Sequence, residues 1–111
     1  MRLVILESPF AGQVEANLTY ARACLRDCIL RGESPLASHC LLTAPGVLDD
    51  DDSLERKLGM EAGHAWLPFA DAVVVYTDRG ISQGMHAGIV LAWAAGTPVE
   101  YRTLREMRAA A

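Results

Sequence analysis

Apolar residues recur along this chain in two patterns, which divide it into short apolar runs and longer amphipathic segments. Short apolar runs rich in β-branched residues are typical of buried parallel strands, and they predict strands at residues 2–6 and 72–77. Two shorter and less apolar segments, residues 35–38 and 99–101, are predicted as the other strands. Apolar residues at helical spacing predict amphipathic helices between the strands. These helices are expected at about residues 14–30, 53–67 and 83–95.

Turn and capping residues mark the expected ends of these helices. Gly32 ends the first helix, Ser53 is the expected N-cap of the second, and Gly96-Thr97-Pro98 stops the third. Residues 39–52 are predicted to form a long loop. Residues 103–111 are expected to be a short polar helix or a frayed tail. Two aromatic residues near the end of the second helix are expected in the core, namely Trp66 and Phe69.

The alternation of strands and helices predicts an α/β fold, a Rossmann-like or flavodoxin-like doubly wound parallel sheet formed by residues 1–111 as one domain. Because crossovers are right-handed, we expect about four strands in the order 2-1-3-4 with helices on both faces. The order reverses between the first and third strands. Ligands bind in the crevice at the carboxyl ends of strands beside such a reversal.

Charge and composition narrow the range of partners. The chain has 111 residues, with 10 basic and 14 acidic side chains and a net charge of −4. A nucleic-acid partner calls for a basic face, so we expect none. We also expect no membrane association, because no apolar segment approaches the roughly 20 residues of a membrane span. Three cysteines and no signal-peptide pattern predict reduced thiols and a cytoplasmic location.

The cysteines and aspartates do not predict a metal site. Cys24 and Cys28 lie four apart on a helix, but no further His or Cys pair completes a tetrahedral set. The consecutive side chains of Asp49–Asp52 cannot all converge on one ion, so we interpret this run as a solvated loop. The sequence also lacks GxGxxG, so no dinucleotide cofactor is expected. We therefore predict neither a metal nor a cofactor.

Two loops leave the strands beside the reversal, and both carry candidate ligand-binding residues. The first, residues 7–12, provides a hydroxyl, an aromatic face and backbone amides near a helix start, which favour an anion or a polar ligand. The second, residues 78–86, provides an acid, a hydroxyl, two glycines and another helix start. The ligand-binding residues that we predict are Ser8, Pro9, Phe10, Gly80, Ser82, Gly84 and Met85.

Each of these loops also has a purely structural interpretation. The first loop can be an ordinary turn before a helix. Gly84 and Gly88 lie on one helix face, where a missing side chain permits either close packing on the sheet or close approach of a ligand. Ser82 is the expected N-cap under both interpretations. His39 follows the second strand, where a structural and a catalytic role remain equally open.

The order and spacing of three motifs resemble the nucleoside 2-deoxyribosyltransferase-like superfamily, especially its short uncharacterised phage and bacterial members. The motifs are Leu6-Glu7-Ser8-Pro9-Phe10, Ala70-Asp71-Ala72-Val73-Val74-Val75, and Gly84-Met85-x-x-Gly88 continuing to Gly96-Thr97-Pro98-Val99. This resemblance covers nearly the whole chain. It implies a nucleoside in the crevice, a glutamate nucleophile at the start of the third helix, an aspartate that assists the leaving base, and oligomers in which a neighbour completes the site.

The chain departs from that pattern at the nucleophile. Alignment on Gly84-Met85 puts His86 at the glutamate position, whereas alignment back from the Gly-x-Pro turn puts Gly88 there. Neither residue is a carboxylate, although Asp78 matches the family's loop aspartate. The remaining candidate acids, Glu61 and Glu100, lie away from this loop. We therefore expect no base exchange between deoxyribonucleosides.

Three functions remain open at this point. The first is binding of a small nucleoside or nucleotide derivative at the crevice without transferase activity. The second is a nucleoside or nucleotide N-glycosidase in which Asp78 activates water, with His39 or His86 as acid or base. The third is a non-catalytic interaction protein.

The third predicted helix also indicates self-association. It is apolar nearly all round, and its large apolar residues are the consecutive Ile89, Val90 and Leu91 and the nearby Trp93. Such a helix needs cover from its own sheet on one side and from a partner on the other. We therefore expect a homodimer.

Overall fold

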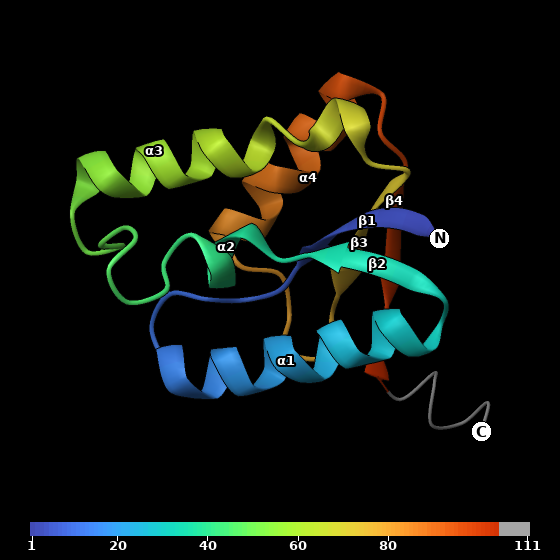
Figure 1. The fold of residues 1–111 in the computed structure, drawn as a ribbon, viewed down its shortest axis with the longest axis horizontal. Coiled ribbons are helices and arrows are strands. Elements are labelled where there is room, and N and C mark those ends of the chain that lie inside the picture. The colour runs from blue at the N-terminus through green and yellow to red at the C-terminus, as the bar shows by residue number, and fades with distance from the viewer. Residues whose placement is uncertain (105–111) are drawn as a thin grey trace.

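In the computed structural model, which describes residues 1–104, a four-stranded sheet lies between helices on its two faces (Figure 1). Its strands are β1 (Arg2–Glu7), β2 (Glu33–Leu36), β3 (Ala72–Tyr76) and β4 (Val99–Arg102). The helical elements are α1 (Val14–Leu30), α2 (Ser38–Leu41), α3 (Ser53–His64), the 3-10 turn η1 (Leu67–Phe69) and α4 (Gln83–Ala95). All strand pairs are parallel and the order is β2-β1-β3-β4, so the predicted fold class and strand order are confirmed.

The central strands β1 and β3 are buried on both sides, which explains their nearly continuous apolar sequences. Alternate residues enter two cores. Val4, Leu6, Val74 and Tyr76 belong to the core that includes residues of α1. The other core, which includes residues of α4, contains Ile5, Val73, Val75, Met85, Ile89 and Ala92. Because side chains alternate along a strand, Glu7 continues the series of Ile5 toward the face covered by α4.

The second strand lies two residues earlier than predicted. It covers Glu33–Leu36 instead of 35–38, because Glu33 pairs in register with Arg2 of β1. The predicted 39–52 loop accordingly includes most of the short helix α2. These differences arise from pairing with β1, which the local pattern of residues 33–38 does not encode.

The prediction for α3 was correct at its start and wrong at its cap and its end. Asp52 is the N-cap, because its side chain accepts hydrogen bonds from the N–H groups of Leu54 and Glu55 at 3.0 and 3.1 Å. The helix ends at His64. The aspartate run is therefore a solvated segment whose last member has a structural role.

Trp66 and Phe69 are not core residues, contrary to our expectation. They are 55% and 74% exposed, whereas Leu67 between them is 5% exposed. The 3-10 turn η1 explains this result, because it directs Leu67 into the core shared with α4 and leaves its neighbours outside.

The helix ends at Gly32 and Gly96 follow the prediction. Both glycines have positive φ angles, +85° and +73°, which favour glycine after a helix. No helix within residues 1–104 is long and apolar enough to cross a membrane. Most of the segment predicted as a polar tail, residues 105–111, lies outside the described residues.

A buried ion pair connects the two edge strands. Arg102 at the end of β4 donates to both carboxylate oxygens of Glu33 at the start of β2, over 2.7 and 3.0 Å. The Arg102 guanidinium also lies 5.7 Å from the ring centre of Tyr76, so the pair is on the α1 side of the sheet. Hydrogen bonding to Arg102 lowers the pKa of Glu33, so this carboxylate is ionised in the folded protein at neutral pH.

We predict that Glu33→Gln lowers the free energy of unfolding by up to about 3 kcal/mol, because Arg102 loses its buried charged partner and keeps only the half-exposed Glu100. Urea denaturation at pH 7 measures this change. Since the pKa of Glu33 is lowered in the folded state, the pair's contribution is present above the ordinary pKa of 4.5 and is lost as the pH falls below it.

The matched control is Glu61→Gln. Glu61 is 63% exposed and lies 4.0 Å from Lys57, so its loss should change stability by less than about 0.5 kcal/mol. Equal effects of the two substitutions would show that the buried pair is not a main support of the sheet.

Candidate functional site

A cavity of about 120 Å³ opens at the carboxyl end of β1, next to the point where the strand order reverses. Its walls come from the loop after β1, from α2 and the loop that follows it, from α3, and from the first turn of α4. Helix α3 extends past the end of the sheet (Figure 1), where its residues form one side of the cavity. This position agrees with the general rule for ligand sites in doubly wound sheets.

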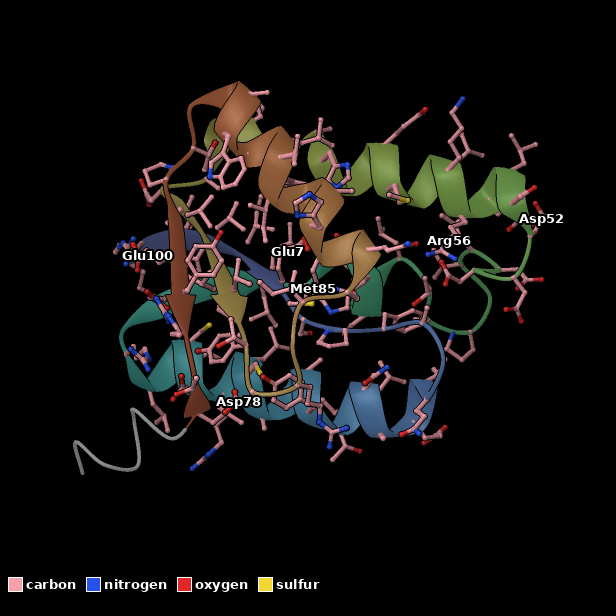
Figure 2. The ribbon with its side chains drawn as sticks, turned by 180° about the vertical axis from the view of Figure 1, so that it is seen from behind. Glu7, Asp52, Arg56, Asp78, Met85 and Glu100 are labelled. Atoms are coloured by element: carbon pink, nitrogen blue, oxygen red, sulfur yellow. The ribbon has the colours of Figure 1, made fainter. Side chains whose placement is uncertain are left out.

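Glu7 is the acidic side chain nearest to the sheet in this cavity. A β-carbon built on Gly88 of α4 would lie 2.8 Å from Oε1 and 2.9 Å from both Cδ and Oε2 of Glu7. Figure 2 shows Glu7 close to Met85, which also lines the cavity, and well apart from Asp78. The missing side chain at Gly88 therefore leaves the space that the Glu7 carboxyl group occupies.

The surroundings of Glu7 disfavour the ionised form of its carboxyl group. Within residues 1–104, no hydrogen bond or ion pair reaches its carboxyl group. Burial raises the pKa of Glu7 from the ordinary 4.5 to about 8. At neutral pH the group is therefore mostly protonated.

A hydrogen-bonded polar pair, Ser8 and His39, lines the cavity beside Glu7. The hydroxyl oxygen of Ser8 lies 2.8 Å from Nε2 of His39, so the two side chains share a hydrogen bond. Burial lowers the pKa of His39 to about 4, which keeps the imidazole neutral at physiological pH. The ring of Phe10 meets His39 edge-on, with ring centres 6.2 Å apart. This wall therefore combines aromatic surface with a neutral donor and acceptor.

The opposite wall carries charge of both signs. Asp50, Glu55 and Arg56 line it, together with His64, whose pKa is lowered by burial. One oxygen of Glu55 accepts a hydrogen bond from the N–H of Asp49. No ion pair to Arg56 occurs within the described part of the chain. This wall therefore offers ionic or hydrogen-bonding partners to both positively and negatively charged groups of a ligand.

Half of the residues that the sequence predicted for the site line this cavity. The lining residues among them are Ser8, Phe10, His39, Gly84 and Met85. The other predicted residues lie outside its lining, and these are Pro9, Asp78, Gly80, Ser82 and His86. The cavity thus lies mainly beside β1, α2 and α3 and only partly beside the loop after β3.

Asp78 has structural partners instead. The hydroxyl of Tyr20 donates to its carboxylate at 2.7 Å, and the N–H of Leu104 donates to both oxygens at 3.3 and 3.1 Å. Asp78 therefore links α1 to the segment that follows β4. Ser82 caps α4 by accepting from the N–H of Met85 at 3.3 Å, as predicted, and His86 is exposed.

Glu7 was not among the site residues that the sequence predicted. Two signals were present: an ionisable residue directly follows a buried strand, and it stands two positions after Ile5, on the side of the strand that α4 covers. Its proximity to Gly88 was not visible, because 81 positions separate the two residues (88 − 7). Of the two positions that the resemblance aligned with a glutamate, Gly88 lies beside Glu7, whereas His86 is exposed.

The fold and the cavity at the strand reversal define an α/β protein of the doubly wound class. Within this class, the chain belongs to the family described as "Domain of unknown function (DUF7768)", whose sequence model matches residues 2–102. No curated protein matches the chain.

Solved structures give a more distant comparison. The chain is similar to a 2-deoxyribosyltransferase from the psychrotolerant bacterium Bacillus psychrosaccharolyticus, with a TM-score of 0.63 and 18% identity over 91% of this chain and 72% of the other. It is also similar to the Clostridium botulinum CMP N-glycosidase BcmB, with a TM-score of 0.53 and 14% identity over 92% and 69% of the two chains. At these identities the similarity shows a shared α/β fold.

We predict that Gly88→Ala displaces the Glu7 carboxyl group toward the solvent-filled part of the cavity. The new β-carbon would come within 2.9 Å of the carboxyl atoms, and these end a flexible side chain that can turn away. The pKa of Glu7 should then fall from about 8 toward 4.5, with a stability change of about 1 kcal/mol or less. Titration of the ¹³C-labelled glutamate carboxyl groups by NMR measures this pKa.

The matched control is Gly84→Ala. This glycine is also in α4, but a β-carbon there meets no atom within 4 Å, so the Glu7 titration should not change. If Glu7 titrates at the same pH in both variants, its contact with Gly88 does not set its environment.

Proposed function

We propose that the chain binds a small nucleoside or nucleotide in the cavity at the end of β1. The observation that carries this proposal is the composition of the cavity wall, where aromatic rings stand beside a neutral hydroxyl–imidazole pair and polar groups of both charges. A nucleoside presents the matching features, namely a flat base with donors and acceptors and a hydroxylated sugar. The names of the two structural neighbours, a 2-deoxyribosyltransferase and a CMP N-glycosidase, support this choice of ligand class.

In the proposed complex, the base stacks on Phe10 beside His39. Stacking of a base on an aromatic side chain is typically worth about 1–3 kcal/mol. Ser8 and the neutral imidazole of His39 supply hydrogen bonds to the ligand. The first turn of α4 at Gly84 adds backbone N–H groups, which have no acceptors within their own helix.

The proposed ligand site does not include Asp78 or His86. The Asp78 carboxylate already accepts hydrogen bonds from Tyr20 and Leu104, and His86 lies outside the cavity lining. We therefore do not favour the N-glycosidase mechanism that the sequence suggested through these two residues. His39 remains in the proposal as a ligand-contacting residue.

We predict that Phe10→Ala weakens binding of a nucleoside or nucleotide about tenfold, because it removes the stacking surface. Isothermal titration calorimetry with adenosine, cytidine, their 2′-deoxy forms and their 5′-monophosphates measures the effect. Tyr101→Ala serves as the control, since the aromatic ring of Tyr101 is 51% exposed on β4 and lies outside the cavity lining, so its loss should not change affinity.

Two results would contradict this proposal in different ways. Absence of binding by every one of these compounds at about 1 mM would overturn the proposed function. Binding that Phe10→Ala does not weaken would mean that the base lies elsewhere.

We further propose that the functional unit is a homodimer formed through the outer face of α4. Ile89 packs inward at 2% exposure, whereas Val90, Leu91 and Trp93 are 43%, 41% and 59% exposed. The exposed Trp66 precedes η1 and the exposed Phe69 is its last residue, and η1 packs against α4. A second copy of the chain would cover these apolar side chains.

We predict that the wild-type chain is a dimer at tens of micromolar, roughly the range in which an interface of micromolar affinity is occupied, and that Trp93→Asp is a monomer. Light scattering coupled to size-exclusion chromatography measures both masses. The control is Ile29→Asp, which places a charge at an equally exposed apolar residue of α1 and should leave the dimer intact. A monomeric wild-type chain would overturn the proposed interface.

A further inference from the structure

Glu7, which is partly buried, differs from the fully buried carboxyl groups Asp27 and Glu33. Asp27 pairs with Arg31 and accepts from Tyr76, and Glu33 pairs with Arg102. For Glu7, no such partner occurs within residues 1–104. A carboxyl group that is partly removed from water without a partner costs folding free energy, and groups of this kind concentrate at functional sites.

We propose that Glu7 is the catalytic carboxyl group of the cavity, and that the chain hydrolyses the N-glycosidic bond of the nucleoside or nucleotide bound there. This proposal rests on the proposed binding function. It assigns chemistry to β1 instead of to the loop after β3, which carries the acid that the sequence pattern favoured.

The contact with Gly88 supports this role. A side chain at residue 88 would begin where the Glu7 carboxyl group now lies, within 2.9 Å of its atoms. Because residue 88 is glycine, α4 leaves this point of the cavity to the carboxyl group of Glu7 on β1.

The other titratable groups around the cavity are less suited to donate a proton. His39 on α2 is neutral because its pKa is lowered to about 4, and it is hydrogen-bonded to Ser8. The first turn of α4 contributes Gly84 and Met85, which carry no charge. The remaining ionisable groups are on α3 and the loop before it, and they are Asp50, Glu55, Arg56 and His64.

The proposed reaction uses Glu7 first as an acid and then as a base. Because its pKa is raised to about 8, Glu7 carries a proton at neutral pH and donates it to a nitrogen of the base. The bond between that base and the anomeric carbon breaks, and its electron pair stays with the base. A water oxygen then bonds to the anomeric carbon, and the proton that this water loses returns to Glu7. Nucleoside and water thus become free base and free sugar.

The first experiment measures release of free base by chromatography. The wild-type chain and Glu7→Gln are incubated with 2′-deoxyadenosine, adenosine, cytidine and the adenosine and cytidine 5′-monophosphates. We expect the wild type to release base from at least one of these compounds. Glu7→Gln keeps the shape of the side chain without the titrating proton, so its rate should be at least about a hundredfold lower, while calorimetry should show unchanged binding.

The control substitution is Glu61→Gln on the exposed face of α3, which should retain the wild-type rate. Binding without base release by the wild type would overturn this inference and leave the proposed function standing. Base release that Glu7→Gln retains would overturn the role of Glu7. Absence of both binding and release would overturn the proposed function itself.

A second experiment does not depend on any substitution. Since the protonated form of Glu7 starts the reaction, kcat/KM of the wild type should fall as the pH rises through about 8. A rate that stays constant or increases between about pH 7 and 9 would overturn the acid role. Formation of deoxycytidine from deoxyadenosine and free cytosine, abolished in Glu7→Gln, would also overturn it, because base exchange requires a covalent sugar–enzyme intermediate that a nucleophilic Glu7 would form.

Discussion

Glu7 and Gly88 lie side by side where β1 ends beneath α4, and the carboxyl group of Glu7 occupies the space that a side chain at residue 88 would need. A β-carbon at residue 88 would lie 2.8 Å from Oε1 of Glu7. The glycine therefore allows α4 to cover the sheet closely while a carboxyl group stays at the inner end of the cavity. Burial in this position keeps Glu7 protonated, because no cation or N–H group within residues 1–104 compensates its charge.

The two faces of the sheet hold carboxyl groups in opposite protonation states. On the α1 side, Arg102 lowers the pKa of Glu33 and keeps it ionised. On the α4 side, burial without a partner raises the pKa of Glu7. The Glu33–Arg102 pair connects the edge strands β2 and β4. Glu33 also pairs with Arg2 at the start of the central strand β1, from whose other end Glu7 enters the cavity.

The loop after β3 has a different role from the loop after β1. Asp78 accepts hydrogen bonds from Tyr20 of α1 and from the backbone of Leu104, so it holds parts of the fold together. The cavity is instead enclosed by α2 and α3, which follow β2. The candidate site is therefore displaced from the β1–β3 reversal toward β2, although it begins at that reversal.

Local sequence determined the spacing of the apolar residues, the order of the strands and helices, and thus the class of fold. The apolar run of β3, the helical spacing of α4 and the cap at Ser82 each depend on residues close together in the chain. Right-handed crossovers then restricted the strand order to the one observed. The loop after β1 was identified as a wall of the site on the same basis, whereas the other predicted wall, residues 78–86, contributes only Gly84 and Met85 to the lining.

Tertiary structure alone decided which residues of those loops meet. The contact of Glu7 with Gly88 and the hydrogen bond from Tyr20 to Asp78 join positions far apart in the chain. The register of β2 and the exposure of Trp66 likewise depend on packing against distant elements. A residue's charge state follows from such surroundings, which no pattern along the chain records.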